Sequence, residues 1–213
     1  MSGSTADHQA RSNKGWGLAA AACLGLWLVQ SGSEHATPPA PSAAEAFAAG
    51  PGWHTTAAAE PLTPSAPVRI RIPRIGVDAP VVRLGLAPDG SLEVPPPGNR
   101  NVAGWYRDGT PPGAEGTAIM AGHVDNAQGP AVFYALGSLR KGDRIEVARV
   151  DGRTAVFTVD AVEVYDNDAF PDAKVYGRAA RAELRVITCG GDYAPETGYQ
   201  GNVVAYAHLI GAR

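Results

Sequence analysis

The pattern of apolar and polar positions predicts strands in the last two thirds of the chain. Residues 68–72 alternate between the two kinds, as a half-buried strand does. Similar runs, bounded by Gly, Pro or Asp, give eight predicted strands: 68–72, 80–84, 91–94, 117–121, 144–150, 154–164, 182–188 and 202–209. Helical patterns do not alternate with these runs, so we predict an all-β, eight-stranded β-barrel rather than a βαβ sheet. One or two short helices are expected, at 131–139 and near 170–176.

The pattern is different at the amino terminus. Residues 1–14 are polar and end with Arg11 and Lys14, whereas residues 15–30 carry no charge. A basic segment followed by an apolar one is typical of a signal peptide or a signal-anchor, and the apolar run is shorter than the ~20 residues that span a bilayer comfortably. Trp16 and Trp27 near its ends, with no clean Ala-x-Ala cleavage site after it, favour an uncleaved transmembrane signal-anchor.

Residues 31–66 are rich in Ala, Pro, Ser and Thr and show no sustained periodicity. A segment of this composition cannot bury a core, so we predict a disordered linker between the anchor and a folded domain at 67–213. The positive-inside rule keeps residues 1–14 in the cytoplasm, which puts the folded domain outside the cell. The predicted location is therefore the cell membrane, with a single pass and an extracellular domain.

Composition narrows the possible partners. The formal net charge of −3 gives no sign of a basic surface for nucleic acid. The two cysteines, Cys23 and Cys189, are too few for a disulfide framework, and Cys23 lies inside the apolar run, so Cys189 is expected to be a free thiol. No tight His, Cys or Asp spacing suggests a metal site, and neither a metal nor a cofactor is expected.

Cys189 and His123 are the candidate catalytic residues of the folded domain. Each follows a predicted strand and has glycine beside it, which allows a ligand to approach the backbone closely. A free thiol is mostly protonated at neutral pH, so a nucleophilic cysteine needs a base or a cation nearby, and His123 can be that base. Taken singly, such a cysteine is more often a core residue. Asp125 can orient His123 or simply end a loop, and His208, inside the last strand, is expected to be structural.

Several segments together resemble the sortase family, particularly its class F group from high-GC Gram-positive (actinobacterial) bacteria. The similarity covers essentially all of residues 67–213, with matching motif order and spacing. The segments are Ile72-Pro-Arg-Ile-Gly-Val-Asp-Ala-Pro80, Gly104-Trp-Tyr106, Ala121-Gly-His-Val-Asp125, Pro130-Ala-Val-Phe-Tyr134, Gly142-Asp143, Ile187-Thr-Cys-Gly-Gly191, Thr197-Gly-Tyr199 and Asn202-Val-Val204.

The resemblance implies a sortase-type β-barrel and a cysteine transpeptidase. Cys189 would attack the carbonyl of a Leu-Pro-x-Thr-Gly sorting motif and form a thioacyl enzyme, and an amine would then accept the acyl group. His123 would be the general acid and base. The implied partners are secreted proteins with a C-terminal sorting motif and an amine acceptor such as a cell-wall precursor. A monomer is expected.

The sequence departs from the family at one catalytic position. Sortases use an arginine in the strand after the cysteine, where this chain has Gln200 or, in another register, Asn202. Either amide can donate a hydrogen bond to an oxyanion, without the charge of arginine. We favour Asn202, and an arginine from elsewhere, such as Arg185 or Arg107, could also take the role.

Two other functions stay open at the level of sequence. The first is a thiol peptidase, in which water accepts the acyl group. The second is a catalytically weak surface-binding barrel that retains the thiol without the arginine. Formation of an acyl-enzyme, and its transfer to an amine rather than to water, would separate the three.

Overall fold

The computed structural model describes residues 37–47 and 56–213. The predicted cytoplasmic tail (1–14) and signal-anchor (15–30) lie outside these residues. Within the described ranges, no helix has the length and apolar character needed to cross a membrane. Contacts between Cα atoms group residues Pro38–Arg213 into one compact unit, which holds every element described below.

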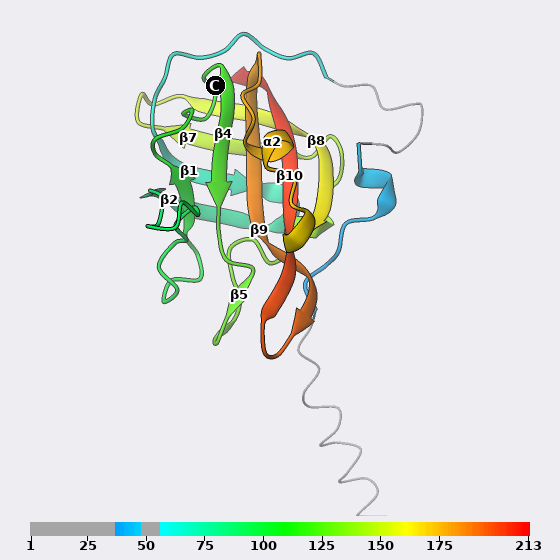
Figure 1. Cartoon of the computed structure of the whole chain (residues 1–213). Helices are drawn as coiled ribbons and strands as arrows, with labels where there is room; N and C mark the ends of the chain where they lie inside the picture. Colours follow the sequence, from blue (N-terminus) through cyan, green and yellow to red (C-terminus); the bar gives the residue numbers. More distant parts are fainter. Residues whose placement is uncertain (1–36, 48–55) are drawn as a thin grey trace, which may run out of the picture. The chain divides into compact units, whose positions relative to one another are not determined.

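The fold is a closed barrel of eight strands, in the order β1-β2-β3-β4-β9-β10-β8-β7 (Figure 1). The all-β, eight-stranded barrel predicted from the alternating pattern is therefore confirmed. The strands are β1 (Pro67–Ile72), β2 (Val77–Leu84), β3 (Ala103–Tyr106), β4 (Gly116–Ala121), β7 (Arg144–Arg149), β8 (Thr154–Asp166), β9 (Ala182–Ala194) and β10 (Gly198–Ala212).

Two of the strand pairs in the barrel are parallel, and one of them, β4 with β9, leads to the site. β2 pairs with β3, and β4 pairs with β9, in parallel register, whereas the other neighbours are antiparallel. The long connection from β4 to β9 includes the small hairpin of β5 (Asp125–Asn126) and β6 (Gly129–Pro130). Because β4 and β9 run the same way, their carboxyl ends reach the same end of the barrel.

Residues at alternate positions along the strands face inward and fill the barrel. Ile70 and Ile72 of β1 and Phe157 of β8 are fully buried, as period-2 alternation requires. A second apolar cluster lies on the outer face, where Val175 of the short helix α2 (Asp172–Tyr176) packs with Ile119 of β4 and Ile187 of β9. Figure 1 shows α2 lying over β9 and β10. The helix predicted near 170–176 is thus present, and it covers the outer face beside the site.

Two predicted elements are wrong. Residues 91–94 form no strand, and only an isolated bridge joins Leu92 to Leu86; the strand that completes the barrel is β3. The helix predicted over 131–139 is a series of turns with one short 3₁₀ helix, η3 (Leu136–Ser138). A Cβ at Gly137 would lie 2.0 Å from the carbonyl oxygen of Pro39. This glycine therefore serves close packing against the 37–47 segment, which a periodicity argument cannot detect.

The predicted disordered linker (31–66) is corrected for the residues of it that the structure describes. Phe47 packs edge-on against Tyr206, with ring centroids 4.9 Å apart, and its backbone N–H donates to Glu163. Further along, the Ala59 N–H donates to the Leu209 carbonyl. Aromatic packing and backbone hydrogen bonds therefore hold parts of this Ala/Pro-rich segment on the barrel without regular secondary structure. Residues 31–36 and 48–55 lie outside the described ranges.

Candidate active site

Cys189 and His123 lie just beyond the paired parts of two parallel strands, β9 and β4. The last registered pair of β4 and β9 is Ala121 with Ile187, so each candidate residue lies two positions beyond it. Two hydrogen bonds hold these ends together: the Gly122 N–H donates to the Ile187 carbonyl at 3.2 Å, and the Thr188 hydroxyl donates to the Gly122 carbonyl at 2.8 Å. Parallel pairing thus brings the two predicted residues to one end of the barrel.

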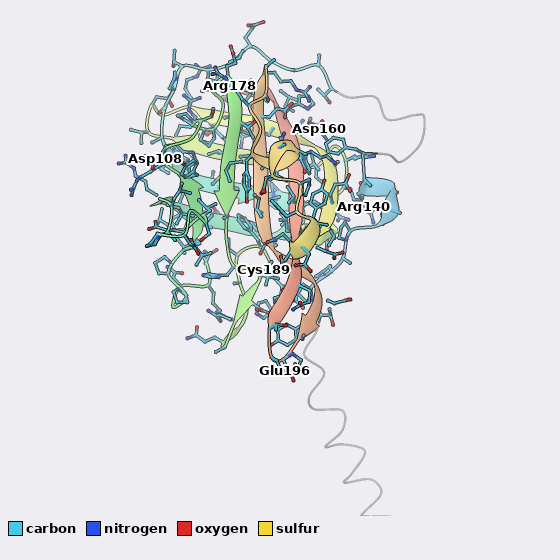
Figure 2. The ribbon with its side chains drawn as sticks, viewed as in Figure 1. Asp108, Arg140, Asp160, Arg178, Cys189 and Glu196 are labelled. Atoms are coloured by element: carbon cyan, nitrogen blue, oxygen red, sulfur yellow. The ribbon has the colours of Figure 1, made fainter. Side chains whose placement is uncertain are left out.

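Cys189 lies in β9 and is an exposed free thiol. Figure 2 shows it where β9 leaves the barrel and continues into the hairpin that ends near Glu196. In β10, Asn202 stands directly opposite Cys189. The thiol is therefore accessible from solvent and has one short polar side chain on the neighbouring strand.

The backbone of His123 is held on two sides. Its carbonyl accepts from the Phe133 N–H at 3.1 Å, while the preceding residue, Gly122, bonds to β9. A Cβ at Gly122 would lie 2.7 Å from atoms of both Val132 and Phe133, so only glycine leaves room for the close approach of this segment. The glycine before the histidine, noted in the sequence, is explained by packing.

The His123 ring has a defined tautomer. Nε2 lies 2.7 Å from the Pro95 carbonyl oxygen, which can only accept a hydrogen bond. Nε2 therefore carries a proton, and in the neutral ring Nδ1 has the free lone pair. The nitrogen that can take up or release a proton in this arrangement is Nδ1.

The electrostatic environment of Cys189 favours the thiol over the thiolate. Partial burial raises the pKa of Cys189, and the negative charge of Asp125 raises it further, while a backbone hydrogen bond opposes both. Asp125 lies in β5 and accepts a 2.5 Å hydrogen bond from the Tyr199 hydroxyl of β10. One sequence hypothesis was that Asp125 orients His123. The described hydrogen bond of Asp125 goes to Tyr199 instead.

Asn202 and Gln200, the two candidates for the missing arginine, differ in what their amides contact. Both N–H groups of Gln200 have acceptors within the β9–β10 turn: the Thr197 hydroxyl and the Gly198 carbonyl, each at 2.7 Å. The Asn202 amide nitrogen donates to the Asn167 side-chain oxygen at 3.0 Å, which uses one of its two hydrogens. Asn202 therefore has a donor to offer next to the thiol, and Gln200 does not.

The two alternative arginines are engaged elsewhere. Arg185 is buried, donates to Glu183 at 2.7 Å and lies over the Tyr206 ring, with 4.6 Å between the guanidinium carbon and the ring centroid. Arg107 is exposed, and its ion-pair partner is the adjacent Asp108, at 3.7 Å. Neither contact directs a guanidinium toward Cys189.

His208 has a structural setting. It is fully buried, its Nδ1 lies 2.7 Å from Asp160, and its Nε2 lies 2.7 Å from the Thr56 carbonyl oxygen. Burial raises the pKa of Asp160, and the bond from His208 opposes that rise. In the described part of the chain, no group of three His, Cys, Asp or Glu side chains is arranged to hold a metal ion.

Sequence reasoning missed three contributors to the site: the Pro95 carbonyl, the Tyr199 hydroxyl and the Asn167 amide. Each belongs to a segment remote in sequence from the residue it contacts, and prolines at 95–97 read only as a loop. Tyr199 lies in the family-like segment Thr197-Gly-Tyr199, but that segment gives no sign that its hydroxyl contacts Asp125.

Comparison with known proteins identifies the family of this chain. The model of the sortase domain matches residues 70–210, which is most of the chain. The chain belongs to the sortase family. Sortase membership implies a cysteine transpeptidase. No curated protein sequence matches the chain.

Solved sortase structures share the barrel. Sortase A of Listeria monocytogenes is 21% identical, with a TM-score of 0.52 over 70% of this chain and 90% of that one. Sortase C1 of Streptococcus agalactiae, solved as a complex with MTSET, is 21% identical with a TM-score of 0.51 over 67% and 68% of the two chains. A Clostridium perfringens sortase D5 transpeptidase is 21% identical with a TM-score of 0.50 over 68% and 79%. At these identities the likeness concerns the fold.

Proposed function

We propose that this sortase cleaves a Leu-Pro-x-Thr-Gly sorting motif through a thioacyl intermediate on Cys189 and transfers the acyl group to an amine at the cell surface. The observation that carries the proposal is the position of Cys189 and His123, each two residues beyond the last registered pair of the parallel strands β9 and β4. The motif order in the sequence favours the class F group.

The first half of the reaction forms the thioester. Nδ1 of His123 takes the proton of the Cys189 thiol, while its Nε2–H stays bonded to the Pro95 carbonyl. The thiolate sulfur attacks the scissile carbonyl carbon, and the electron pair of the C=O bond moves to oxygen. When the tetrahedral intermediate collapses, the C–N bond breaks and His123 gives its proton to the departing amine. A thioester on Cys189 remains.

The second half reverses these steps with a new amine. His123 removes a proton from the acceptor amine, whose nitrogen attacks the thioester carbon, and the sulfur leaves as a thiolate that regains the proton. The second hydrogen of the Asn202 amide is the donor that we assign to the oxyanion in both halves. This single neutral hydrogen bond would take the place of the bidentate hydrogen bonds that a charged guanidinium donates.

The partners follow from this chemistry and from the sequence. The donors are secreted proteins with a C-terminal sorting motif, and the acceptor is a cell-wall precursor or a similar amine. An N-terminal anchor at 15–30 would keep the domain at the extracellular face of the membrane, where both substrates occur.

The test is a product analysis. The full chain in detergent is incubated with a peptide containing Leu-Pro-x-Thr-Gly and with triglycine as the amine. We expect the transfer product to exceed the hydrolysis product, and both to vanish in Cys189→Ala and His123→Ala. Hydrolysis without transfer would mean a thiol peptidase, and no product with several motifs over a wide pH range would leave a surface-binding barrel.

A further inference from the structure

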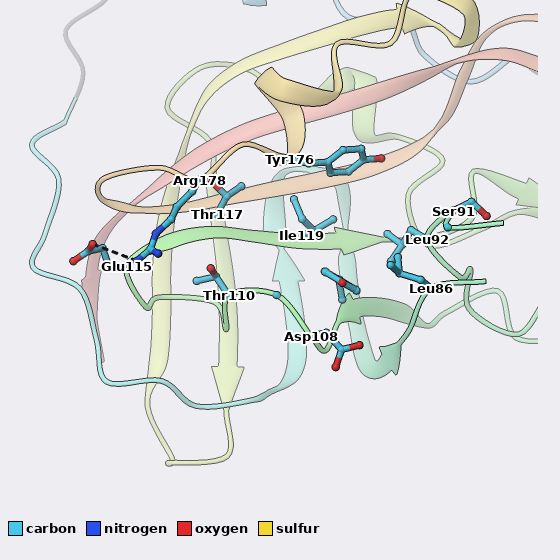
Figure 3. A pocket seen from close by; sticks show the side chains of 13 residues that line it. Leu86, Ser91, Leu92, Asp108, Thr110, Glu115, Thr117, Ile119, Tyr176 and Arg178 are labelled. Atoms are coloured by element: carbon cyan, nitrogen blue, oxygen red, sulfur yellow. Dashed lines mark ion pairs between the residues drawn. The ribbon is translucent and has the colours of Figure 1, made fainter. Parts of the chain in front are cut away.

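The connection between β2 and β3, residues 85–102, passes directly beside His123. Its first part lies along β4: Figure 3 shows Leu86 and Leu92 near the carboxyl end of that strand. Leu92 packs against the outer cluster that includes Ile119. The next part begins with Pro95, which is buried and whose carbonyl oxygen lies 2.7 Å from Nε2 of His123. The connection therefore brings a backbone acceptor to the ring of the candidate base.

Three successive prolines form this part of the connection, the proline segment (95–97). Proline fixes φ and has no N–H, so a run of three is stiff and offers only carbonyl acceptors. The Pro96 carbonyl accepts from the Asn99 N–H at 3.2 Å, and the Pro97 carbonyl accepts from the side-chain nitrogen of Asn126 at 2.9 Å. Because the segment is stiff, a bond that fixes Pro97 also fixes the carbonyl two residues before it.

The Asn126 amide can point in only one direction. Its side-chain oxygen lies 2.9 Å from the Gln128 backbone nitrogen, which can only donate a hydrogen bond. The amide nitrogen therefore faces the Pro97 carbonyl, which can only accept. An aspartate at this position would keep the first bond and lose the second, so the position needs an amide.

A third contact joins the same two segments. Nη1 of Arg100 donates to the Gln128 carbonyl at 3.0 Å. The contacts of residues 95, 97 and 100 with residues 123, 126 and 128 follow in the same order along both segments. Arg100 is exposed and Asn126 is half-buried, so water competes more with the Arg100 contact. The Asn126 bond is therefore the main tie between the proline segment and the β5–β6 hairpin.

We propose that Asn126 is a positioning residue for His123. Its amide holds Pro97, the proline segment passes that position on to Pro95, and the Pro95 carbonyl keeps the proton of the ring on Nε2. Nδ1 then has the lone pair with which the ring accepts the thiol proton. A ring without this acceptor can turn and carry its proton on Nδ1, where it cannot act as the base. The consequence for catalysis rests on the proposed function, whereas the tautomer does not.

The first measurement is the tautomer of His123 in the full chain in detergent. Long-range ¹H–¹⁵N correlation spectra at alkaline pH, where neutral imidazole rings dominate, distinguish a protonated ring nitrogen from an unprotonated one. The signals of His123 are those that disappear in His123→Ala. We expect the Nε2–H form alone in the unaltered protein and a mixture of both forms in Asn126→Ala. Asn126→Asp, which loses only the donor to Pro97, should give the same mixture.

The second measurement is the kinetics of the sorting-peptide reaction. In Asn126→Ala, kcat should fall about tenfold because the base is misoriented in part of the molecules. KM should change less than about twofold, since Asn126 orients the base and does not bind the peptide. The matched control is Gln128→Ala in the same hairpin. It keeps both backbone contacts of residue 128 and should leave the tautomer, kcat and KM unchanged.

Two results would overturn the role of Asn126. One is a pure Nε2–H form of His123 in Asn126→Ala, and the other is a loss of kcat equal in Asn126→Ala and Gln128→Ala. If the unaltered protein cleaves no sorting peptide, the proposed function fails. The tautomer comparison still decides the positioning role in that case, because it does not depend on turnover.

Discussion

At the scale of single residues, the site combines a thiol with a carboxylate that disfavours its ionisation. The pKa of Cys189 is raised by burial and then by Asp125, and the described residues provide no cation that offsets them. In the proposed reaction His123 takes the thiol proton, and the lone pair at Nδ1 is suited to that step.

Replacing Asp125 with asparagine should lower the pKa of Cys189. Removing a negative charge favours the thiolate, and the amide oxygen can still accept from the Tyr199 hydroxyl. The expected change is a lower midpoint, because the charge of Asp125 is one cause of the raised pKa of Cys189. The rate of iodoacetamide alkylation against pH measures it, with Asp168→Asn as the control. A midpoint that is unchanged or higher in Asp125→Asn would contradict this electrostatic assignment.

Truncating the two amides should distinguish them. Asn202→Ala removes the donor next to the thiol and should lower kcat/KM on the sorting peptide by about 100-fold, as loss of an oxyanion donor does. Gln200→Ala removes an amide whose bonds lie within the turn, and should change kcat/KM by less than about threefold. A larger loss in Gln200→Ala than in Asn202→Ala would reverse the assignment.

The candidate residues could be found from the sequence, but their contacts could not. A cysteine and a histidine after apolar runs with glycines beside them are local features. The Pro95 contact to His123 and the Tyr199 contact to Asp125 join positions 28 and 74 residues apart. Such pairs depend on how the barrel closes, which a local pattern does not contain.

At the scale of elements, the long antiparallel pair β8–β10 carries a buried polar group. His208 of β10 contacts Asp160 of β8 on one side and the Thr56 carbonyl on the other. Each ring nitrogen of His208 thus faces a hydrogen-bond acceptor. The three groups therefore hold a shared proton, and the contact to Thr56 ties that residue to the barrel. A buried pair of this kind is costly to break, because removing His208 leaves the Asp160 carboxylate with only the longer contact to Arg181, at 3.6 Å.

His208→Ala should therefore lower the free energy of unfolding by about 3 kcal/mol. Urea denaturation followed by tryptophan fluorescence measures the change. The control is Arg69→Ala, which removes one partner of the exposed Arg69–Asp78 ion pair and should lower the free energy of unfolding far less. Equal losses in the two variants would show that the buried group contributes no more than a surface pair.

Regular alternation predicted most strands, and the failures have particular causes. β3 is only four residues long and reads Ala-Gly-Trp-Tyr, so it gives no alternation to detect. Leu92 and Val94, the apolar residues of 91–94, lie in a loop beside the site instead. Residues 131–139 contain enough helix formers to suggest a helix, but Gly137 is needed where Pro39 approaches the backbone. Tertiary contacts override local preference at each of these places.

At the scale of the whole molecule, the family and the barrel agree with the sequence, whereas the membrane anchor remains a prediction. We expect the protein to fractionate with membranes and to retain its N-terminus. Cell fractionation with N-terminal sequencing of the purified protein tests both. A mature protein beginning after about residue 33 would show that the apolar segment is a cleaved signal peptide.

The most direct measurement is the intact mass of the protein after brief incubation with a Leu-Pro-x-Thr-Gly peptide. A thioacyl intermediate predicts a mass increase equal to the peptide segment up to threonine, located on Cys189 by fragmentation. The adduct should be released by hydroxylamine and be absent in Cys189→Ala. A sorting peptide that is cleaved without any such adduct, or an adduct that persists in Cys189→Ala, would contradict covalent catalysis by this thiol.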